Sequence, residues 1–254
     1  MICVLKDSVL QKHAVHTLVN SKPSSKSWFV KTREICLQYG LPHPLVLLRS
    51  TKTKDQIKRM AKKSIVNFWE IKFRADAGQL PSLEYFHPEY MSLTQPHPIW
   101  TSAGANPYQV KMSTIQAVML SGRYRTELLC SKWSPTNLGF CQAPSCQDLP
   151  AFEDLHHILA VCRSLEPTRQ RLINFTLRVP DQHPDVQIIV RKYCVPSHPQ
   201  FVQFLLDCSV LPEVVLARQQ YGAAILTCLF RITRTWCYCL HKARLKLLNR
   251  WKKF

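Results

Sequence analysis

The chain has 254 residues, with 34 Lys and Arg against 16 Asp and Glu, which gives a formal net charge of +18. A hydrophobic fraction of 46% with only 20% charged residues excludes a disordered chain. The presence of only 6 Gly argues against glycine-rich nucleotide loops and a turn-dense β-sandwich or barrel. The excess of positive charge indicates a polyanionic partner, either a nucleic acid or an anionic membrane surface.

No run of residues approaches the roughly 18 apolar residues that a membrane-spanning helix requires. The N-terminus lacks a signal-peptide pattern because Lys6 and Asp7 interrupt its apolar residues. We therefore expect an intracellular protein, in the nucleus or cytoplasm, whose thiols stay reduced. The 11 Cys, an odd number, disfavour a complete disulfide framework, so the important ones should be metal ligands or buried apolar residues.

Apolar residues at helical spacing predict an all-α fold. The second helix is expected to end at Gly40, and the third to begin with a capping box formed by Thr53 and Gln56. Residues 80–107, rich in proline and aromatic residues, predict an ordered strap, and residues 186–190 could be extended. Helices are expected over residues 1–20, 28–39, 53–73, 107–130, 165–177 and from residue 201 onward.

Positive charge gathers at the two ends of the sequence. Residues 1–74 hold 15 basic and 4 acidic residues (net +11), residues 75–213 hold 10 and 12 (net −2), and residues 214–254 hold 9 and none (net +9). The last of these parts contains a long basic amphipathic helix with Trp236 on its apolar stripe. This distribution predicts two phosphate-binding surfaces joined by a nearly neutral centre.

The candidate nucleic-acid-binding residues are basic side chains at these two ends and a short Arg-Tyr-Arg string between them. Each basic group could instead be a solvated helix face without a partner. Tyr124 could stack on an unpaired base or belong to the core, whereas Trp236 is expected in the core. The candidates are Lys58, Arg59, Lys62, Lys63, Arg123, Tyr124, Arg125, Arg231, Arg234, Lys242, Arg244 and Lys246.

The most specific local pattern is a group of cysteines and a histidine. Four residues separate Cys141 from Cys146, and four separate His157 from Cys162. This spacing can supply three sulfur ligands and one nitrogen ligand to a tetrahedral Zn²⁺ ion. His157 is preferred to its neighbour His156 because it lies closer to the helix face of Cys162. Cys130 is a possible substitute ligand, although the string Leu128-Leu129-Cys130 is more typical of the end of a packed helix. The alternative interpretation is that these are ordinary core residues in a cysteine-rich chain.

Nothing in the sequence predicts catalysis. A polymerase palm holds two metal ions on paired aspartates, and the Asp residues of this chain are scattered through different segments. The sequence also lacks a P-loop, an HExxH motif and a GxSxG motif. We therefore expect a protein that is not an enzyme.

Several longer strings resemble a known family. They are SWFVKTREICLQYGLPHP at 27–44, LPSLEYF at 80–86, MSLT at 91–94 with PHP at 96–98, LSGRYR at 120–125, and LF at 229–230 followed by TRTWCY at 233–238. Together with the Cys/His group, they resemble the C-terminal region, downstream of the polymerase core, of non-LTR (LINE-type) retrotransposon reverse transcriptases.

This resemblance implies a non-catalytic C-terminal fragment that binds template RNA or target DNA, with upstream reverse transcriptase domains as partners. It also implies a CCHC zinc site at the four Cys and His residues named above. We expect a basic helical region over residues 1–130, a Cys/His knuckle over 131–165, and a helical region over 166–254 that ends in the basic amphipathic helix. The alternatives are a basic membrane-surface or protein-interaction module, and an inert relic fragment.

Overall fold

The structure is a computed structural model that describes residues 13, 16, 20, 28–178 and 183–248. It confirms the all-α prediction. Within the described residues, the only strand-like pairing is an isolated antiparallel bridge between Phe140 and Phe152. The predicted helix over residues 1–20 lies almost entirely outside the described residues.

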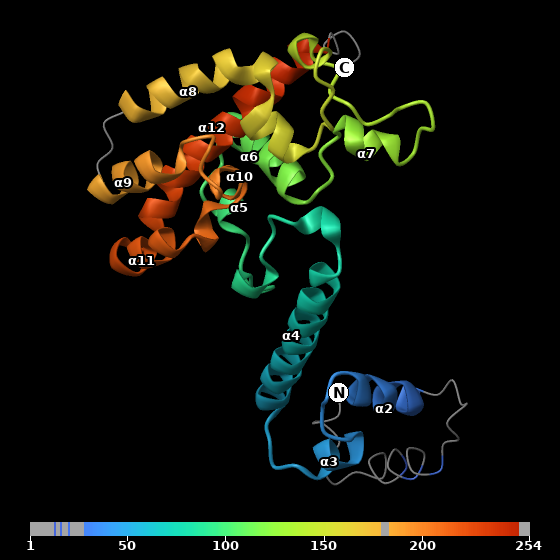
Figure 1. Cartoon of the computed structure of the whole chain (residues 1–254). Coiled ribbons are helices and arrows are strands. Elements are labelled where there is room, and N and C mark those ends of the chain that lie inside the picture. The colour runs from blue at the N-terminus through green and yellow to red at the C-terminus, as the bar shows by residue number, and fades with distance from the viewer. Residues whose placement is uncertain (1–12, 14–15, 17–19, 21–27, 179–182, 249–254) are drawn as a thin grey trace. The chain divides into compact units, whose positions relative to one another are not determined.

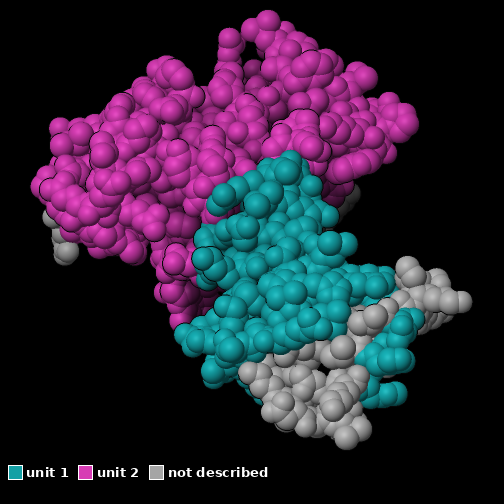
Figure 2. Space-filling view, turned by 90° about the horizontal axis from the view of Figure 1, so that it is seen from below, with its two compact units in different colours: residues 1–76, 92–94 teal, residues 77–91, 95–254 magenta. Residues whose placement is uncertain are grey.

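The chain forms two compact units, shown in different colours in Figure 2. Unit 1 contains residues 1–76 and 92–94, and unit 2 contains residues 77–91 and 95–254. The predicted boundaries at residues 130 and 165 therefore do not separate units. Residues 131–165 are instead an irregular segment inside unit 2, with helices before and after it.

Unit 1 is built from helices that pack through a few aromatic and aliphatic side chains. Gly40 has a φ of +62°, a left-handed conformation that ends the first of these helices where the sequence predicts it. Tyr39 then packs edge-on against Phe68, with 5.0 Å between the ring centroids. The helices are α2 (Trp28–Gln38), α3 (Pro44–Arg49) and α4 (Lys54–Gly78), of which the last two residues belong to unit 2.

The first turn of α4 carries the predicted capping box. The backbone N–H of Thr53 donates to Gln56 Oε1 at 2.9 Å, and the backbone N–H of Gln56 donates to Thr53 Oγ1 at 3.3 Å. These bonds satisfy two N–H groups that have no partner within the helix. The capping box therefore fixes the start of a helix that is 25 residues long.

The segment over residues 80–107 is an ordered strap, as its aromatic content predicts. Tyr85 and Phe86 pack against the hydrophobic core of unit 2. Ser92 and Leu93 belong to unit 1, where the Ser92 hydroxyl and the Leu93 N–H both donate to Glu70 Oε1 at 3.1 Å. The strap contains the short helices η2 (Pro81–Leu83), η3 (Pro88–Tyr90) and α5 (Pro98–Thr101).

The single helix predicted over residues 107–130 is wrong, because the structure has two helices there: α6 (Pro107–Leu120) and α7 (Glu127–Ser131). The break lies at Gly122, which has a φ of +66°. A Cβ atom at this position would lie 2.0 Å from the backbone oxygen of Ser82, so the strap approaches too closely for any other residue. The chain therefore turns at Gly122 and starts a new helix.

Five helices complete unit 2. Residues 186–190, which the sequence suggests are extended, are helical in the structure. Pro184 occupies the first turn of that helix, where its missing N–H costs nothing, and the spacing of Val186, Ile189 and Val190 buries all three on one face. The helices are α8 (Glu166–Arg178), α9 (Pro184–Tyr193), α10 (Phe201–Leu206), α11 (Pro212–Tyr221) and α12 (Ala223–Leu247).

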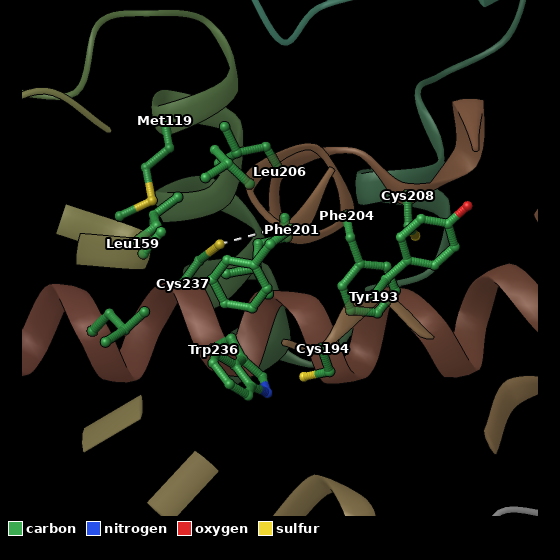
Figure 3. Packing of buried hydrophobic residues seen from close by; sticks show 14 of the residues in the cluster. Met119, Leu159, Tyr193, Cys194, Phe201, Phe204, Leu206, Cys208, Trp236 and Cys237 are labelled. Carbon is green, nitrogen blue, oxygen red and sulfur yellow. Dashed lines mark hydrogen bonds between the residues drawn. The ribbon is translucent and has the colours of Figure 1, made fainter. Parts of the chain in front are cut away.

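The core of unit 2 is arranged around α12, which packs against α5, α6, α8, α9, α10 and α11. Figure 3 shows Trp236 and Cys237 projecting from α12 towards Phe201 and its neighbours. The indole N–H of Trp236 donates to Thr176 Oγ1 at 2.9 Å, which satisfies its one polar group. The prediction that Trp236 is a core residue is therefore confirmed.

The structure also bears on the predicted role of the long C-terminal helix. α12 is 25 residues long and basic, as the sequence predicts, but its apolar face is covered by the other helices of unit 2. A membrane-surface helix needs that face to be accessible to lipid. Among the described residues, no helix combines the length and the apolar character needed to cross a membrane.

Candidate metal centre and candidate nucleic-acid interface

The irregular segment of unit 2 begins with two short antiparallel stretches. The Cys141 N–H donates to the carbonyl of Ala151 at 2.9 Å, and the Glu153 N–H donates to the carbonyl of Gly139 at 2.9 Å. Between these bonds the rings of Phe140 and Phe152 stack with centroids 4.8 Å apart. The pairing closes the loop that contains the 3₁₀ turn η4 (Pro144–Cys146). Cys141 and Cys146, at the start of this loop and in its turn, thereby come close together.

The other two members of the group, His157 and Cys162, lie at the start and just after the end of a π-helical turn, η5 (His157–Val161). The Cys162 N–H donates to the carbonyl of His157 at 2.7 Å, five residues earlier. Because a π-turn is wider than an α-helical turn, residues five apart lie close to one face, and such turns occur frequently at functional sites. The His157 N–H is itself held by Asp154 Oδ1 at 2.6 Å, which fixes the start of the turn.

Cys141, Cys146, His157 and Cys162 form one buried group, in which the four ligand atoms all lie within 4.8 Å of one another. The Sγ of Cys146 lies 3.6 Å from His157 Nε2 and 3.7 Å from the Sγ of Cys162. A tetrahedral zinc ion with arms of about 2.3 Å to sulfur and about 2.0 Å to nitrogen separates these atom pairs by about 3.5 and 3.8 Å. The group could therefore hold a metal ion such as zinc.

The structure also distinguishes between the two candidate histidine ligands, His156 and His157. His157 is buried within the group, whereas the side chain of His156 is exposed and lies outside it. The geometry therefore places His157, and not His156, in the group that could hold a metal ion.

Hydrogen bonding and burial shift the pKa values of the three cysteines in opposite directions. A hydrogen bond from Cys141, supported by His157 and Cys146, holds the pKa of Cys162 well below its ordinary value, although burial opposes this. The hydrogen bond to Cys162 and burial together raise the pKa of Cys141, and burial raises that of Cys146. The thiol protons of Cys141 and Cys146 are therefore harder to remove than that of Cys162. A divalent cation would allow all three to become thiolates.

A buried arginine of α8 anchors the segment that carries the Cys/His group. Arg169 donates through one terminal nitrogen to the carbonyl of Cys162 at 2.6 Å, and through the other to the carbonyl of Ile158 at 3.4 Å. Its charge is balanced by Glu166, whose Oε2 lies 2.7 Å away. The carbonyl of Ile158 lies within the π-turn and that of Cys162 lies directly after it. Arg169 therefore binds backbone carbonyls that have no helical partner at the end of the turn.

A second buried arginine connects the same segment to α12. Arg244 is only 5% exposed and pairs with Glu153, which is 1% exposed. Glu153 Oε1 also accepts the backbone N–H of Glu127 at 2.9 Å, at the start of α7. The prediction that Arg244 binds nucleic acid is therefore wrong. Its guanidinium is used inside the protein, because Glu153 would otherwise be a buried charge without a partner.

Arg234 and Tyr124 are also interior residues and do not belong to a nucleic-acid interface. Arg234 donates to the carbonyl of Phe230 at 2.8 Å, to Ser113 Oγ at 3.2 Å and to the carbonyl of Ser102 at 3.0 Å. The hydroxyl of Tyr124 lies 2.9 Å from His241 Nδ1. Both side chains thus satisfy polar groups within the core of unit 2.

The remaining predicted interface residues are exposed. In unit 1 they occupy α4, and in unit 2 they lie on α12 and in the turn between α6 and α7. The exposed set is Lys58, Arg59, Lys62, Lys63, Arg123, Arg125, Arg231, Lys242 and Lys246.

Sequence reasoning missed the two residues that support the Cys/His group most directly, Arg169 and Glu153. Each is charged and nearly fully buried: Glu153 pairs with Arg244, 91 residues later, and Arg169 binds backbone carbonyls 7 and 11 residues earlier. The one available signal was weak: Glu166 and Arg169 are spaced three residues apart on a predicted helix, which indicates an ion pair but not its second role.

No protein-family model, curated protein or solved structure matches this chain. The resemblance to LINE-type reverse transcriptases therefore stays a prediction from the strings quoted above.

Proposed function

We propose that this chain is a non-catalytic nucleic-acid-binding protein whose helical fold is organised by a structural zinc ion. The observation that carries the proposal is the basic face of α4. Lys58, Arg59, Lys62 and Lys63 are all exposed there, and none has a carboxylate within salt-bridge distance among the described residues. The resemblance described above suggests template RNA or target DNA as the ligand.

The spacing of these charges supports a polyanionic partner. Lys58 and Lys62 are four residues apart, as are Arg59 and Lys63, so each pair places like charges on neighbouring turns. Such pairs destabilise a helix by about 0.2–0.5 kcal/mol each. Phosphate groups would remove this repulsion and release their condensed counterions.

The exposed side of α12 offers a second, smaller group of cations. With 100° per residue, Arg231, Lys242 and Lys246 lie within about 60° of one another around the helix axis. They extend over about 22 Å along the helix at 1.5 Å per residue. All three are exposed, so this face is accessible while the opposite side of α12 forms the core.

The zinc ion would have a structural role. Cys141, Cys146, His157 and Cys162 complete a tetrahedron, so they leave no coordination position for water or a substrate. Catalytic zinc sites keep such a position open. The ion would instead fix the loop and the π-turn, which Arg169 and Glu153 connect to α8 and α12.

Binding is tested by titrating a fluorescent single-stranded RNA, and separately a single-stranded DNA, at several salt concentrations. The wild-type protein should lose affinity steeply as salt rises. Changing Lys58, Arg59, Lys62 and Lys63 together to Gln should reduce the slope of log affinity against log salt by up to about 3, because each lost contact removes about 0.7.

The matched control removes four exposed charges from helices of unit 2, and none from α4, by changing Arg171, Arg178, Arg191 and Arg218 to Gln. It alters the net charge equally and should keep most of the slope. Equal losses in both variants would mean that α4 is not the binding surface. Absent or salt-independent binding by the wild-type protein would overturn the proposed function.

The zinc site is tested by metal analysis of the purified protein. We expect a single zinc ion per chain, lost in Cys146→Ala and retained in Cys130→Ala, because Cys130 lies outside the group. Chelation should lower the melting temperature of the wild-type protein. A metal-free protein whose melting temperature does not change when zinc is added would contradict the site.

A further inference from the structure

Unit 2 contains an open cavity of about 440 Å³ beside α7. Figure 1 shows α7 at the edge of the unit, away from α9 and α11, with a long loop after it. The volume lies within the range of small-molecule pockets. The cavity is lined by Arg125, Glu127, Cys130, Trp133, Ser134 and Asn137.

Trp133 is the most notable of these residues because it is 73% exposed, more than any other large aromatic side chain among the described residues. Its backbone is fixed, since the Trp133 N–H donates to the carbonyl of Cys130 at 3.1 Å at the end of α7. A tryptophan ring has only two side-chain torsions, so holding it against a ligand costs little entropy. It is therefore a suitable platform for a flat aromatic ligand.

The charges around the cavity favour an anionic ligand. Arg125 is exposed and has no hydrogen bond or ion pair to another residue in the described part of the chain. Arg123 and Lys132 are exposed nearby in the sequence. The one acidic lining residue, Glu127, is only 3% exposed, accepts a hydrogen bond from Asn137 Nδ2 at 2.7 Å, and shares Arg244, 3.9 Å away, with Glu153, so the nearby cations outnumber the carboxylate that faces the cavity.

The polar walls argue against an aliphatic side chain or a lipid tail as the occupant. Filling the cavity with such a group would remove water from the partly exposed side chains of Ser134 and Asn137 without replacing its hydrogen bonds. A nucleobase has a π-face to stack on Trp133 and a polar edge to face these residues, and its phosphate could pair with Arg125.

From this combination we infer that the cavity binds one unpaired nucleobase of a single-stranded nucleic acid, with Trp133 as the stacking surface and Arg125 as the phosphate contact. This inference rests on the proposed function and deepens it. The cations of α4 bind phosphates irrespective of base pairing, whereas this cavity selects strands with an unpaired base.

The test uses the full chain and a short fluorescent oligouridine, with a matched oligonucleotide that has abasic sites. Trp133→Ala should weaken binding of oligouridine about tenfold or more and leave the melting temperature unchanged, because the side chain is exposed. Trp133→Phe should recover part of the affinity. Phe175→Ala, which removes a 63% exposed aromatic ring from α8, is the control and should change nothing.

The abasic strand separates stacking from a general effect. Wild-type protein and Trp133→Ala should bind it equally, since the base that would stack on Trp133 is absent. An equal loss on both strands, or unchanged affinity of Trp133→Ala for oligouridine, would overturn the inference while salt-dependent binding through α4 still supports the proposed function. Failure of the wild-type protein to bind either strand would instead overturn both.

Discussion

α4 and α12 are both 25 residues long, and both have basic side chains along most of their length. In α4 the cations at Lys58, Arg59, Lys62 and Lys63 are all exposed. In α12 the cations alternate, because Arg231 faces solvent while Arg234 and Arg244 are buried among polar partners. Positive charge on a helix therefore does not show by itself whether a residue binds a partner or stabilises the fold.

The difference follows from what surrounds each helix. α12 lies in the centre of unit 2, so any long side chain on most of its faces must find partners in the protein. The guanidinium group meets this need because it has five donors in a planar arrangement. Both buried cations of α12 are arginines, whereas three of the four cations of the α4 face are lysines.

The largest expected effect is at the buried pair of α12. Arg244→Ala leaves Glu153 buried without its cation, which should lower the free energy of unfolding by about 3–5 kcal/mol. Arg231→Ala, on the exposed side of the same helix, should stay within about 0.5 kcal/mol. Urea denaturation followed by circular dichroism measures both, and similar values for the two variants would contradict the distinction between buried and exposed arginines.

A smaller effect is expected where α12 meets α8. Thr176→Val removes the acceptor of the Trp236 indole N–H and leaves that group buried without a partner, at a cost of about 1–3 kcal/mol. The control is Thr235→Val on α12, where the lost hydroxyl contacts only the carbonyl of Arg231 one turn earlier. Chemical denaturation compares the two, and a Thr176→Val variant as stable as its control would show that the indole finds another acceptor.

In α4 the corresponding effect is local. Thr53→Ala removes half of the capping box and should cost about 1 kcal/mol, through increased fraying of the first turn. Thr51→Ala, outside the helix, is the control. Hydrogen exchange of the amides in residues 54–58 reports the fraying directly, and equal exchange rates in the two variants would mean that the box does not stabilise the helix.

The smallest effect has the opposite sign. Lys58→Glu turns the repulsive pairs that Lys58 forms with Lys54 and Lys62 into attractive ones, but places a carboxylate three residues after Asp55. The net stabilisation of α4 should be about 0.3–0.5 kcal/mol at low salt. The gain should disappear at high salt, because it is electrostatic. The same variant should bind RNA more weakly. Denaturation and RNA titration together test this, and a variant that is stabilised without loss of binding would remove Lys58 from the interface.

The features that depend on neighbouring residues could be predicted from the sequence. Gly40 ends α2, Thr53 and Gln56 cap α4, and the spacing of Cys141, Cys146, His157 and Cys162 identifies the residues that gather in space. The two helix ends depend on residues only a few positions apart. The Cys/His group could be recognised because few types of side chain bind metal ions.

The features that depend on distant partners could not be predicted. Arg244 is buried against Glu153, a partner 91 residues earlier in the chain. Arg234 is buried against Ser102 and Ser113, which are more than a hundred residues earlier. The break at Gly122 depends on the approach of Ser82. The spacing of these residues in the sequence predicts only that they lie on a helix. Whether their side chains are buried depends on distant segments that the folded chain brings next to them.

The central place of α12 has a consequence for protein synthesis. Every helix that packs against α12 precedes it in the sequence, so α5, α6 and α8–α11 leave the ribosome before the element that covers their apolar faces. Until α12 emerges, these faces have no core to join and are available to chaperones or to aggregation. A ribosome that stalls before residue 223 would release a chain whose second unit lacks its centre, however complete its earlier helices are.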